Sequence, residues 1–203
     1  MNLHKYESYE DYVRLQSSAS VRKRACVWAQ ADVLRVVATE VRNMRVEKPF
    51  GICHGVRNGF EVGYLRDELA DISADVIGTE ISETVSRDSK FTIHWDFHNI
   101  KPEWIGGVDF IYSNSFDHSY KPAECLAAWM RCIATGGACF IEWTKGHNIG
   151  RTDVVDCFQS SLDEYLKLAE GYDVRVVCVD GAKSKTNSTK TTRLIIISHP
   201  KGC

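Results

Sequence analysis

The stretch VRVVCVDGAKSKTNSTKTTRLIIIS, residues 174–198, decides the fold class. Its two ends, Val174–Val179 and Thr192–Ser198, are apolar and rich in β-branched residues, which is typical of buried strands. The polar link between them contains Gly181 and has no apolar face that could pack as a crossover helix. Parallel neighbours need such a crossover, so we expect these two strands to pair antiparallel.

Five further apolar runs precede this hairpin, and each ends abruptly in polar residues. They are FGICHG (Phe50–Gly55), VIGTE (Val76–Glu80), FTIHWD (Phe91–Asp96), VDFIYSNS (Val108–Ser115) and ACFIEW (Ala138–Trp143). Strands that alternate with helical segments predict an α/β fold. We expect a mostly parallel seven-stranded sheet with helices on both faces and a C-terminal antiparallel hairpin. Such sheets bind ligands in the crevice beyond the carboxyl ends of their strands.

Helical spacing of apolar residues predicts the segments that cover this sheet. The expected helices are Val27–Met44, Gly59–Ala70, Pro122–Ile133 and Asp156–Glu170. Near the start of the chain, Tyr6, Tyr9, Tyr12 and Leu15 recur every three residues along one side of a further helix. We expect residues 1–203 to form a single domain with residues 1–25 as an N-terminal helical extension. That extension either packs on the sheet edge or closes as a lid that brings Tyr9, Tyr12 or Gln16 to the ligand.

Composition excludes several classes of protein. The net charge of -2 gives no strong field for nucleic acid, so a nucleic-acid partner is not expected. The start is polar, and no apolar run approaches the length of a membrane span, which predicts a cytoplasmic protein without a membrane partner. The eight cysteines are dispersed without a CxxC pair, which favours free thiols over a zinc site. The oligomeric state stays open.

Together the strand series, the terminal hairpin and the polar strand ends resemble the class I S-adenosylmethionine-dependent methyltransferases, over roughly Pro49–Pro200. The resemblance implies S-adenosyl-L-methionine as cofactor and a small-molecule methyl acceptor. It places a glycine-rich turn against the amino-acid part of the cofactor, here through Cys53, His54, Gly55, Arg57 and Gly59. Cys53 and Arg57 depart from the pattern, because many members carry further glycines there.

The resemblance also gives the later strand ends individual roles. Glu80 would accept hydrogen bonds from the ribose hydroxyls, with Ile81 as an apolar face for the adenine. Asp96 would accept from the adenine amino group beside Phe97. Ser113 and Asn114 would face the methionine part.

The segment Ser113–His118 also supplies the expected catalytic pair, Asp117 and His118. A hydroxyl acceptor must lose its proton as it attacks the methyl group, and histidine titrates near neutral pH. His118 is therefore either a general base or a structural contact, and His147 is a weaker alternative. His94 and His98 have an HxxxH spacing, but they lie on a strand and turn rather than a helix, so no metal site is expected.

Two other functions remain open from the sequence. One is a non-catalytic relative that binds S-adenosylmethionine to stabilise or regulate a partner. The other is an NAD-dependent oxidoreductase, which would prefer a GxGxxG turn that this chain lacks. The identity of the acceptor, and whether an O, N or C atom is methylated, cannot be read from these residues.

Overall fold

The computed structural model describes residues 2–144, 154–179 and 192–200. The helices are α1 (Tyr9–Arg22), α2 (Ala31–Asn43), α3 (Phe60–Glu68), α4 (Glu83–Asp88), α5 (Pro122–Cys132) and α7 (Leu162–Leu168). The strands are β1 (Asn2–Leu3), β2 (Phe50–His54), β3 (Asp75–Glu80), β4 (Thr92–His94), β5 (Val108–Ser113), β6 (Ile133–Thr144), β7 (Phe158–Gln159), β8 (Asp173–Val179) and β9 (Thr192–Ser198). Three short 3₁₀ turns complete the set, η1 (Ala70–Ile72), η2 (Pro102–Trp104) and η3 (Phe116–His118).

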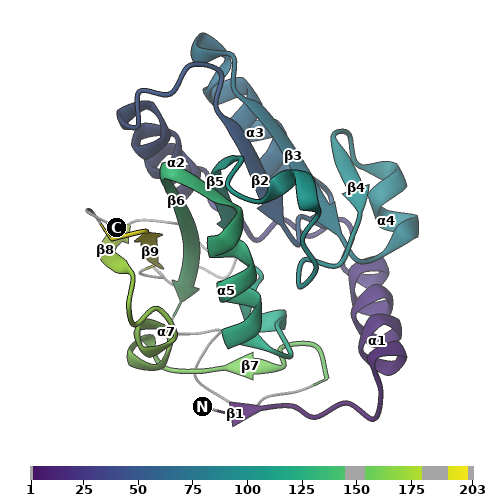
Figure 1. The fold of residues 1–203 in the computed structure, drawn as a ribbon. Coiled ribbons are helices and arrows are strands. Elements are labelled where there is room, and N and C mark those ends of the chain that lie inside the picture. Colours follow the sequence, from purple (N-terminus) through teal and green to yellow (C-terminus); the bar gives the residue numbers. More distant parts are fainter. Residues whose placement is uncertain (1, 145–153, 180–191, 201–203) are drawn as a thin grey trace.

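Seven of these strands form one twisted sheet with helices on both faces (Figure 1). Their order is β4-β3-β2-β5-β6-β9-β8. The first five strands in this order run parallel, whereas β9 lies antiparallel between β6 and β8. The predicted mixed sheet and its C-terminal hairpin are therefore confirmed. A second, two-stranded sheet pairs β1 with β7, and the sequence did not indicate it.

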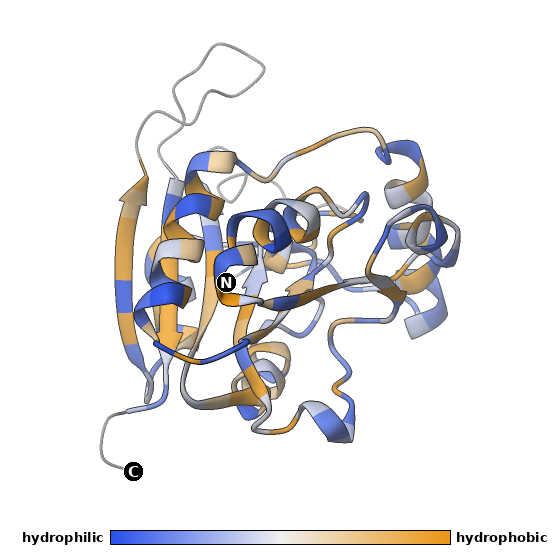
Figure 2. Cartoon of the chain, turned by 90° about the horizontal axis from the view of Figure 1, so that it is seen from above, coloured by the Kyte–Doolittle hydropathy of each residue, from blue (hydrophilic) through white to orange (hydrophobic). Residues whose placement is uncertain are grey.

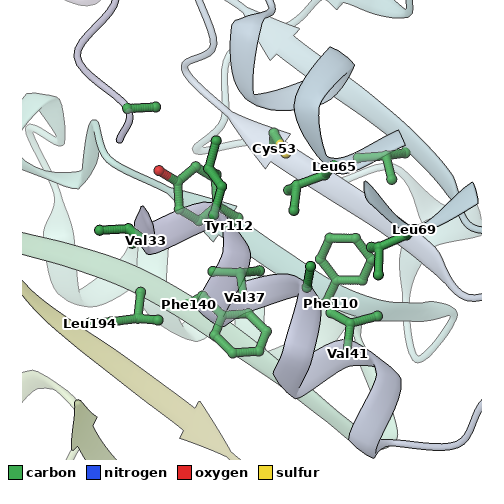
Figure 3. Close-up of a cluster of buried hydrophobic side chains, with 14 of the residues drawn as sticks. Val33, Val37, Val41, Cys53, Leu65, Leu69, Phe110, Tyr112, Phe140 and Leu194 are labelled. Carbon is green, nitrogen blue, oxygen red and sulfur yellow. The ribbon is translucent and has the colours of Figure 1, made fainter. Parts of the chain in front are cut away.

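The core has two parts, one on each face of the main sheet. On one face α2 and α3 pack on the central strands, and Val37, Leu65 and Phe110 belong to this cluster (Figure 3). On the other face α5 and α7 cover the same strands through residues such as Trp129 and Tyr165. Figure 2 shows the resulting pattern, in which the strands are largely hydrophobic and the helices carry hydrophilic residues. Side chains alternate between the two faces along each strand, so only residues at or beyond a strand end are free to line a crevice.

The helix predicted over Asp156–Glu170 is wrong in its first part. Phe158–Gln159 is the strand β7, and α7 begins only at Leu162. Ser161 sets this start through a capping box, in which its hydroxyl accepts from the Glu164 N–H while the Glu164 carboxylate accepts from the Ser161 N–H. The capping signal therefore overrides the weaker apolar spacing before it. In the described part of the chain, no helix has the length and hydrophobicity to cross a bilayer.

Candidate active site

A pocket lies where the parallel strands end, beneath α1. The space between these elements, with its open mouth included, is about 440 Å³. Residues that follow β2, β3, β4 and β5 line one side, and α1 closes the other. The lining residues are Tyr12, Gln16, Ala19, Ser20, Gly55, Arg57, Glu80, Ile81, Asp96, Phe97, Ser115 and His118. The structure thus brings together seven of the residues that the sequence singled out for the cofactor or for catalysis.

The turn after β2 needs glycine at two positions. Gly55 and Gly59 have φ angles of 73° and 72°, a left-handed conformation that side chains disfavour. A Cβ at Gly55 would lie 2.8 Å from Cβ of Ser115, so this turn runs close against the turn after β5. Gly55 lines the pocket, whereas Gly59 caps the start of α3. The turn therefore presents its backbone, rather than side chains, at this side of the pocket.

Glu80, at the end of β3, is buried and accepts three hydrogen bonds. Its Oε2 accepts from the backbone N–H of Arg57 at 2.9 Å. Its Oε1 accepts from the N–H of Ser82 at 2.9 Å and from the hydroxyl of Ser20 at 2.7 Å. The two backbone donors fix the carboxylate toward the pocket, and the Ser20 hydroxyl comes from α1. A carboxylate held in this way is prepared to accept from hydroxyl groups of a ligand.

Asp96 follows β4 and is held by His98. Its Oδ1 accepts from the His98 N–H at 3.0 Å and lies 2.7 Å from His98 Nδ1, while Oδ2 accepts from the Tyr9 hydroxyl at 2.9 Å. Burial acts to raise the pKa of Asp96, but the hydrogen bonds and charge of His98 hold it below its usual value. His98 Nε2 lies 2.9 Å from the Ser119 hydroxyl, which fixes the ring at both nitrogens. Asp96 is therefore an anionic hydrogen-bond acceptor.

Besides Gly59, four more of the expected cofactor residues do not line this pocket. Cys53 is buried in the core against α2 and α3 (Figure 3). His54 is stacked on Trp129 at 4.7 Å between ring centres, and burial lowers the pKa of His54 to about 3. Ser113 is buried and donates to the backbone of residue 54, and Asn114 accepts from a neighbouring hydroxyl. The first three lie within strands, where the pleat sends side chains into the core.

The expected catalytic pair lies at the end of the pocket beyond β5, in the turn η3. The ring of His118 lines the pocket and its Nδ1 lies 3.0 Å from Gln16 Oε1 of helix α1. Asp117 Oδ1 is buried and has no hydrogen-bond partner among the described residues. Burial raises the pKa of Asp117. The charge of His118 lowers this pKa, and the charge of Asp156 raises it further. The alternative base, His147, lies outside the described residues.

The sequence missed four residues at this site. Ser20 and Ala19 come from the polar side of α1, and nothing in the local pattern distinguishes them from a solvated helix face. Ser115 lies within the quoted segment after β5 but was not singled out. His98 was considered only as a metal ligand with His94, yet its nitrogens face Asp96 and Ser119, whereas His94 Nε2 faces a backbone carbonyl.

Comparison with known proteins supports the fold. No protein-family model matches the sequence, and no curated protein is similar to it. Among solved structures, one similar protein is a methyltransferase from Burkholderia thailandensis with bound 1,6-didemethyltoxoflavin and S-adenosylhomocysteine. It shares 10% identity at a TM-score of 0.71, and the match covers 97% of this chain and 93% of that one. Another match is a chain from a Haloferax volcanii complex between the Trm112 methyltransferase activator and a putative methyltransferase. It shares 15% identity at a TM-score of 0.66, and the match covers 97% of this chain and 99% of that one.

A third structure, a TehB-like SAM-dependent methyltransferase from Corynebacterium glutamicum, shares 14% identity at a TM-score of 0.58, covering 94% of this chain and 97% of its own. The chain therefore has the fold of the class I SAM-dependent methyltransferases, as the resemblance predicted. At these identities the likeness concerns the fold and does not extend to the acceptor.

Proposed function

We propose that this protein binds S-adenosyl-L-methionine and transfers its methyl group to a small-molecule acceptor. The observation that carries the proposal is a pair of buried carboxylates that line one pocket, Glu80 at the end of β3 and Asp96 just after the neighbouring strand β4. Both are hydrogen-bond acceptors suited to an adenosine, with Glu80 for the ribose and Asp96 for the adenine amino group. Ile81 and Phe97 lie in the same lining and supply apolar surface for the adenine ring.

The turn after β2 fits the amino-acid end of this cofactor. The conformation of Gly55 leaves the backbone open to close approach, and the side chain of Arg57 lies in the lining to meet a carboxylate. When bound, the cofactor supplies a methyl group that its sulfonium makes electrophilic. The chain's own part is to position the acceptor in line with that methyl group, which by itself lowers the barrier by several kcal/mol.

Asp117 and His118 are proposed to promote the loss of the acceptor's proton, because His118 lies in the pocket lining and its Nε2 is 3.8 Å from Asp117 Oδ1. Helix α1 is proposed as a lid over this end, since Tyr12, Gln16 and Ser20 all face the pocket. The seven free cysteines among the described residues favour a reducing compartment, and we propose the cytoplasm.

A nicotinamide cofactor fits the sheet less well. Ordinary dinucleotide-binding domains continue their parallel order to the last strand. Here β9 lies antiparallel between β6 and β8. The non-catalytic alternative has the same cofactor residues, so turnover separates it from an enzyme.

Titration calorimetry with S-adenosylhomocysteine, S-adenosylmethionine and NAD tests the cofactor. We expect the first two to bind and NAD not to bind. In Glu80→Gln, loss of a charge-assisted bond to the ribose should weaken binding about tenfold to a hundredfold, since such a bond contributes about 1.5–3 kcal/mol. The matched control is Glu83→Gln on the exposed surface of α4, which should bind normally. Tighter binding of NAD, or equal affinities in the two variants, would contradict the proposal.

Turnover is followed as S-adenosylhomocysteine released in the presence of panels of phenols, amines and carbon acids. A methyltransferase should release it with at least one acceptor class. His118→Gln should lower kcat more than it changes the affinity for the cofactor. An unchanged kcat in that variant with an accepted substrate would remove His118 from the reaction.

A further inference from the structure

Three side chains with metal-binding atoms meet beside the pocket, where His118 lines it. Asp117 and His118 lie in η3, and Asp156 comes from the segment just before β7. His118 Nε2 lies 3.6 Å from Asp156 Oδ1 and 3.8 Å from Asp117 Oδ1. One ligand atom from each residue lies within 4.8 Å of the other two. Two carboxylates thus flank a single ring nitrogen.

Helix α1 determines which nitrogen of His118 carries a proton. Gln16 Nε2 donates to the carbonyl of Val155 at 2.7 Å, so the amide oxygen of Gln16 faces the ring. That oxygen accepts only, and it lies 3.0 Å from Nδ1, so Nδ1 is the protonated nitrogen. In the neutral ring Nε2 then presents its lone pair to the two carboxylates. Metal-binding histidines are commonly held in this way, with the second ring N–H donating to an oxygen.

The distances around Nε2 favour a shared ion over direct hydrogen bonds. At 3.6 and 3.8 Å, both carboxylate oxygens lie too far from Nε2 for an N–H···O bond. Ligand atoms that share a tetrahedral ion, each about 2.1 Å from it, lie about 3.4 Å apart. The observed spacing is close to this value. Since the three ligand atoms all lie within 4.8 Å of one another, a contraction of at most about 1.4 Å between any two would bring them to the spacing of a shared ion.

Asp117 supplies independent support. Its Oδ1 is buried, points toward Nε2 and has no hydrogen-bond partner among the described residues. A buried carboxylate oxygen without a partner is costly unless a cation neutralises it. The side chains of His118 and Asp156 are 18% and 29% exposed, so an ion has access from solvent.

We propose that Asp117, His118 and Asp156 bind a divalent transition-metal ion. One imidazole and two carboxylates suit Mn²⁺, Fe²⁺ or Zn²⁺ better than ions that prefer oxygen ligands alone. Three protein ligands leave coordination positions open toward the pocket that His118 lines. Resting on the proposed function, the ion would bind the acceptor's oxygen and lower the pKa of its hydroxyl, so that His118 acts as a ligand and not as the base itself.

Manganese is the probe, because it has little affinity for the exposed thiols of Cys26 and Cys178. Electron paramagnetic resonance of the untagged full chain follows free Mn²⁺ as protein is added. We expect one ion bound per chain, and binding weakened at least about tenfold in Asp117→Asn and Asp156→Asn. Asp163→Asn, an exposed acid on α7, is the matched control and should bind as the parent does.

Circular dichroism of the same samples shows that each variant is folded, and titration with S-adenosylhomocysteine separates this proposal from the function above. Binding of that ligand without uptake of Mn²⁺ overturns the metal site alone. Uptake of Mn²⁺ that both active-site variants retain overturns it as well. If the parent protein takes up Mn²⁺ and these two variants do not, the metal site is supported. If S-adenosylhomocysteine also fails to bind, only the proposed function is wrong.

Discussion

Removing the Ser20 hydroxyl should strengthen cofactor binding while it weakens the fold. The carboxylate of Glu80 offers about four lone-pair sites for hydrogen bonds. Three of these sites are already used by the Arg57 N–H, the Ser82 N–H and the Ser20 hydroxyl. A ribose brings two hydroxyl donors, so one present donor must leave when both bind. Two of the three are backbone groups of the strand-end turns. The Ser20 hydroxyl, on α1, is therefore the group to be displaced.

The size of the effect follows from the bond that is lost. A hydrogen bond to a charged group contributes about 1.5–3 kcal/mol to stability, part of which the ribose hydroxyl restores when it replaces Ser20. In Ser20→Ala the free protein no longer makes this bond, so binding no longer breaks it. We expect S-adenosylhomocysteine to bind about fivefold more tightly, a change of about 1 kcal/mol. The free energy of unfolding without ligand should fall by a similar amount.

Calorimetry and urea unfolding measure the two quantities. Ser18→Ala is the matched control, because Ser18 lies on the same helix, is exposed, and donates only to the carbonyl of Arg14. It should change neither quantity beyond a few tenths of a kcal/mol. If Ser20→Ala instead weakens ligand binding together with stability, Ser20 holds Glu80 for the ligand, and the displacement argument is wrong.

Three further outcomes follow from single positions. Gly55→Ala should lower the free energy of unfolding by about 1–3 kcal/mol in urea titrations, because its φ is positive and a Cβ has no room; no loss would contradict this. Burial raises the pKa of Glu142 to about 7 and that of Glu61 to about 8. Both pKa values are raised above those of the unfolded chain, so the stability that these groups give is complete at low pH and is lost as pH rises toward 8. In Glu142→Gln the free energy of unfolding should therefore fall less steeply with pH, by up to about 1 kcal/mol per pH unit between pH 5 and 7. His98→Phe keeps a ring but removes the partner of Asp96, and should weaken S-adenosylhomocysteine binding about tenfold in calorimetry.

Sequence patterns located the strand ends that surround the pocket, but they did not decide which side chains at those ends line it. Glu80 and Asp96 end or follow apolar runs, and both line the pocket. Cys53 and His54 belong to β2 itself, where alternation sends one side chain toward α2 and the other onto Trp129. Counting from the strand end would not have separated them, because Glu80, the last residue of β3, lines the pocket, whereas His54, the last residue of β2, does not.

Local sequence patterns could not predict contacts between distant segments. Asp156 meets His118 only because the chain returns past η3 to form β7 beside β1. The helix predicted over this segment would have placed Asp156 in its first turn, where the spacing says nothing about η3. Ser20 is one hydroxyl on a polar helix face, and only the packing of α1 over the pocket gives it a partner in Glu80.

Helix α1 was expected either to pack on the sheet edge or to act as a lid, and its contacts explain why one helix can do both. It reaches Asp96 through Tyr9, His118 through Gln16 and Glu80 through Ser20, so polar bonds to the pocket anchor it at three points. Its buried apolar surface is small, because Tyr12 and Ala19 are its only fully buried apolar side chains. An element held mainly by exchangeable hydrogen bonds opens at low free-energy cost. A ligand that satisfies the same carboxylates recovers most of that cost, so α1 can pack firmly in the free protein and still yield to the cofactor.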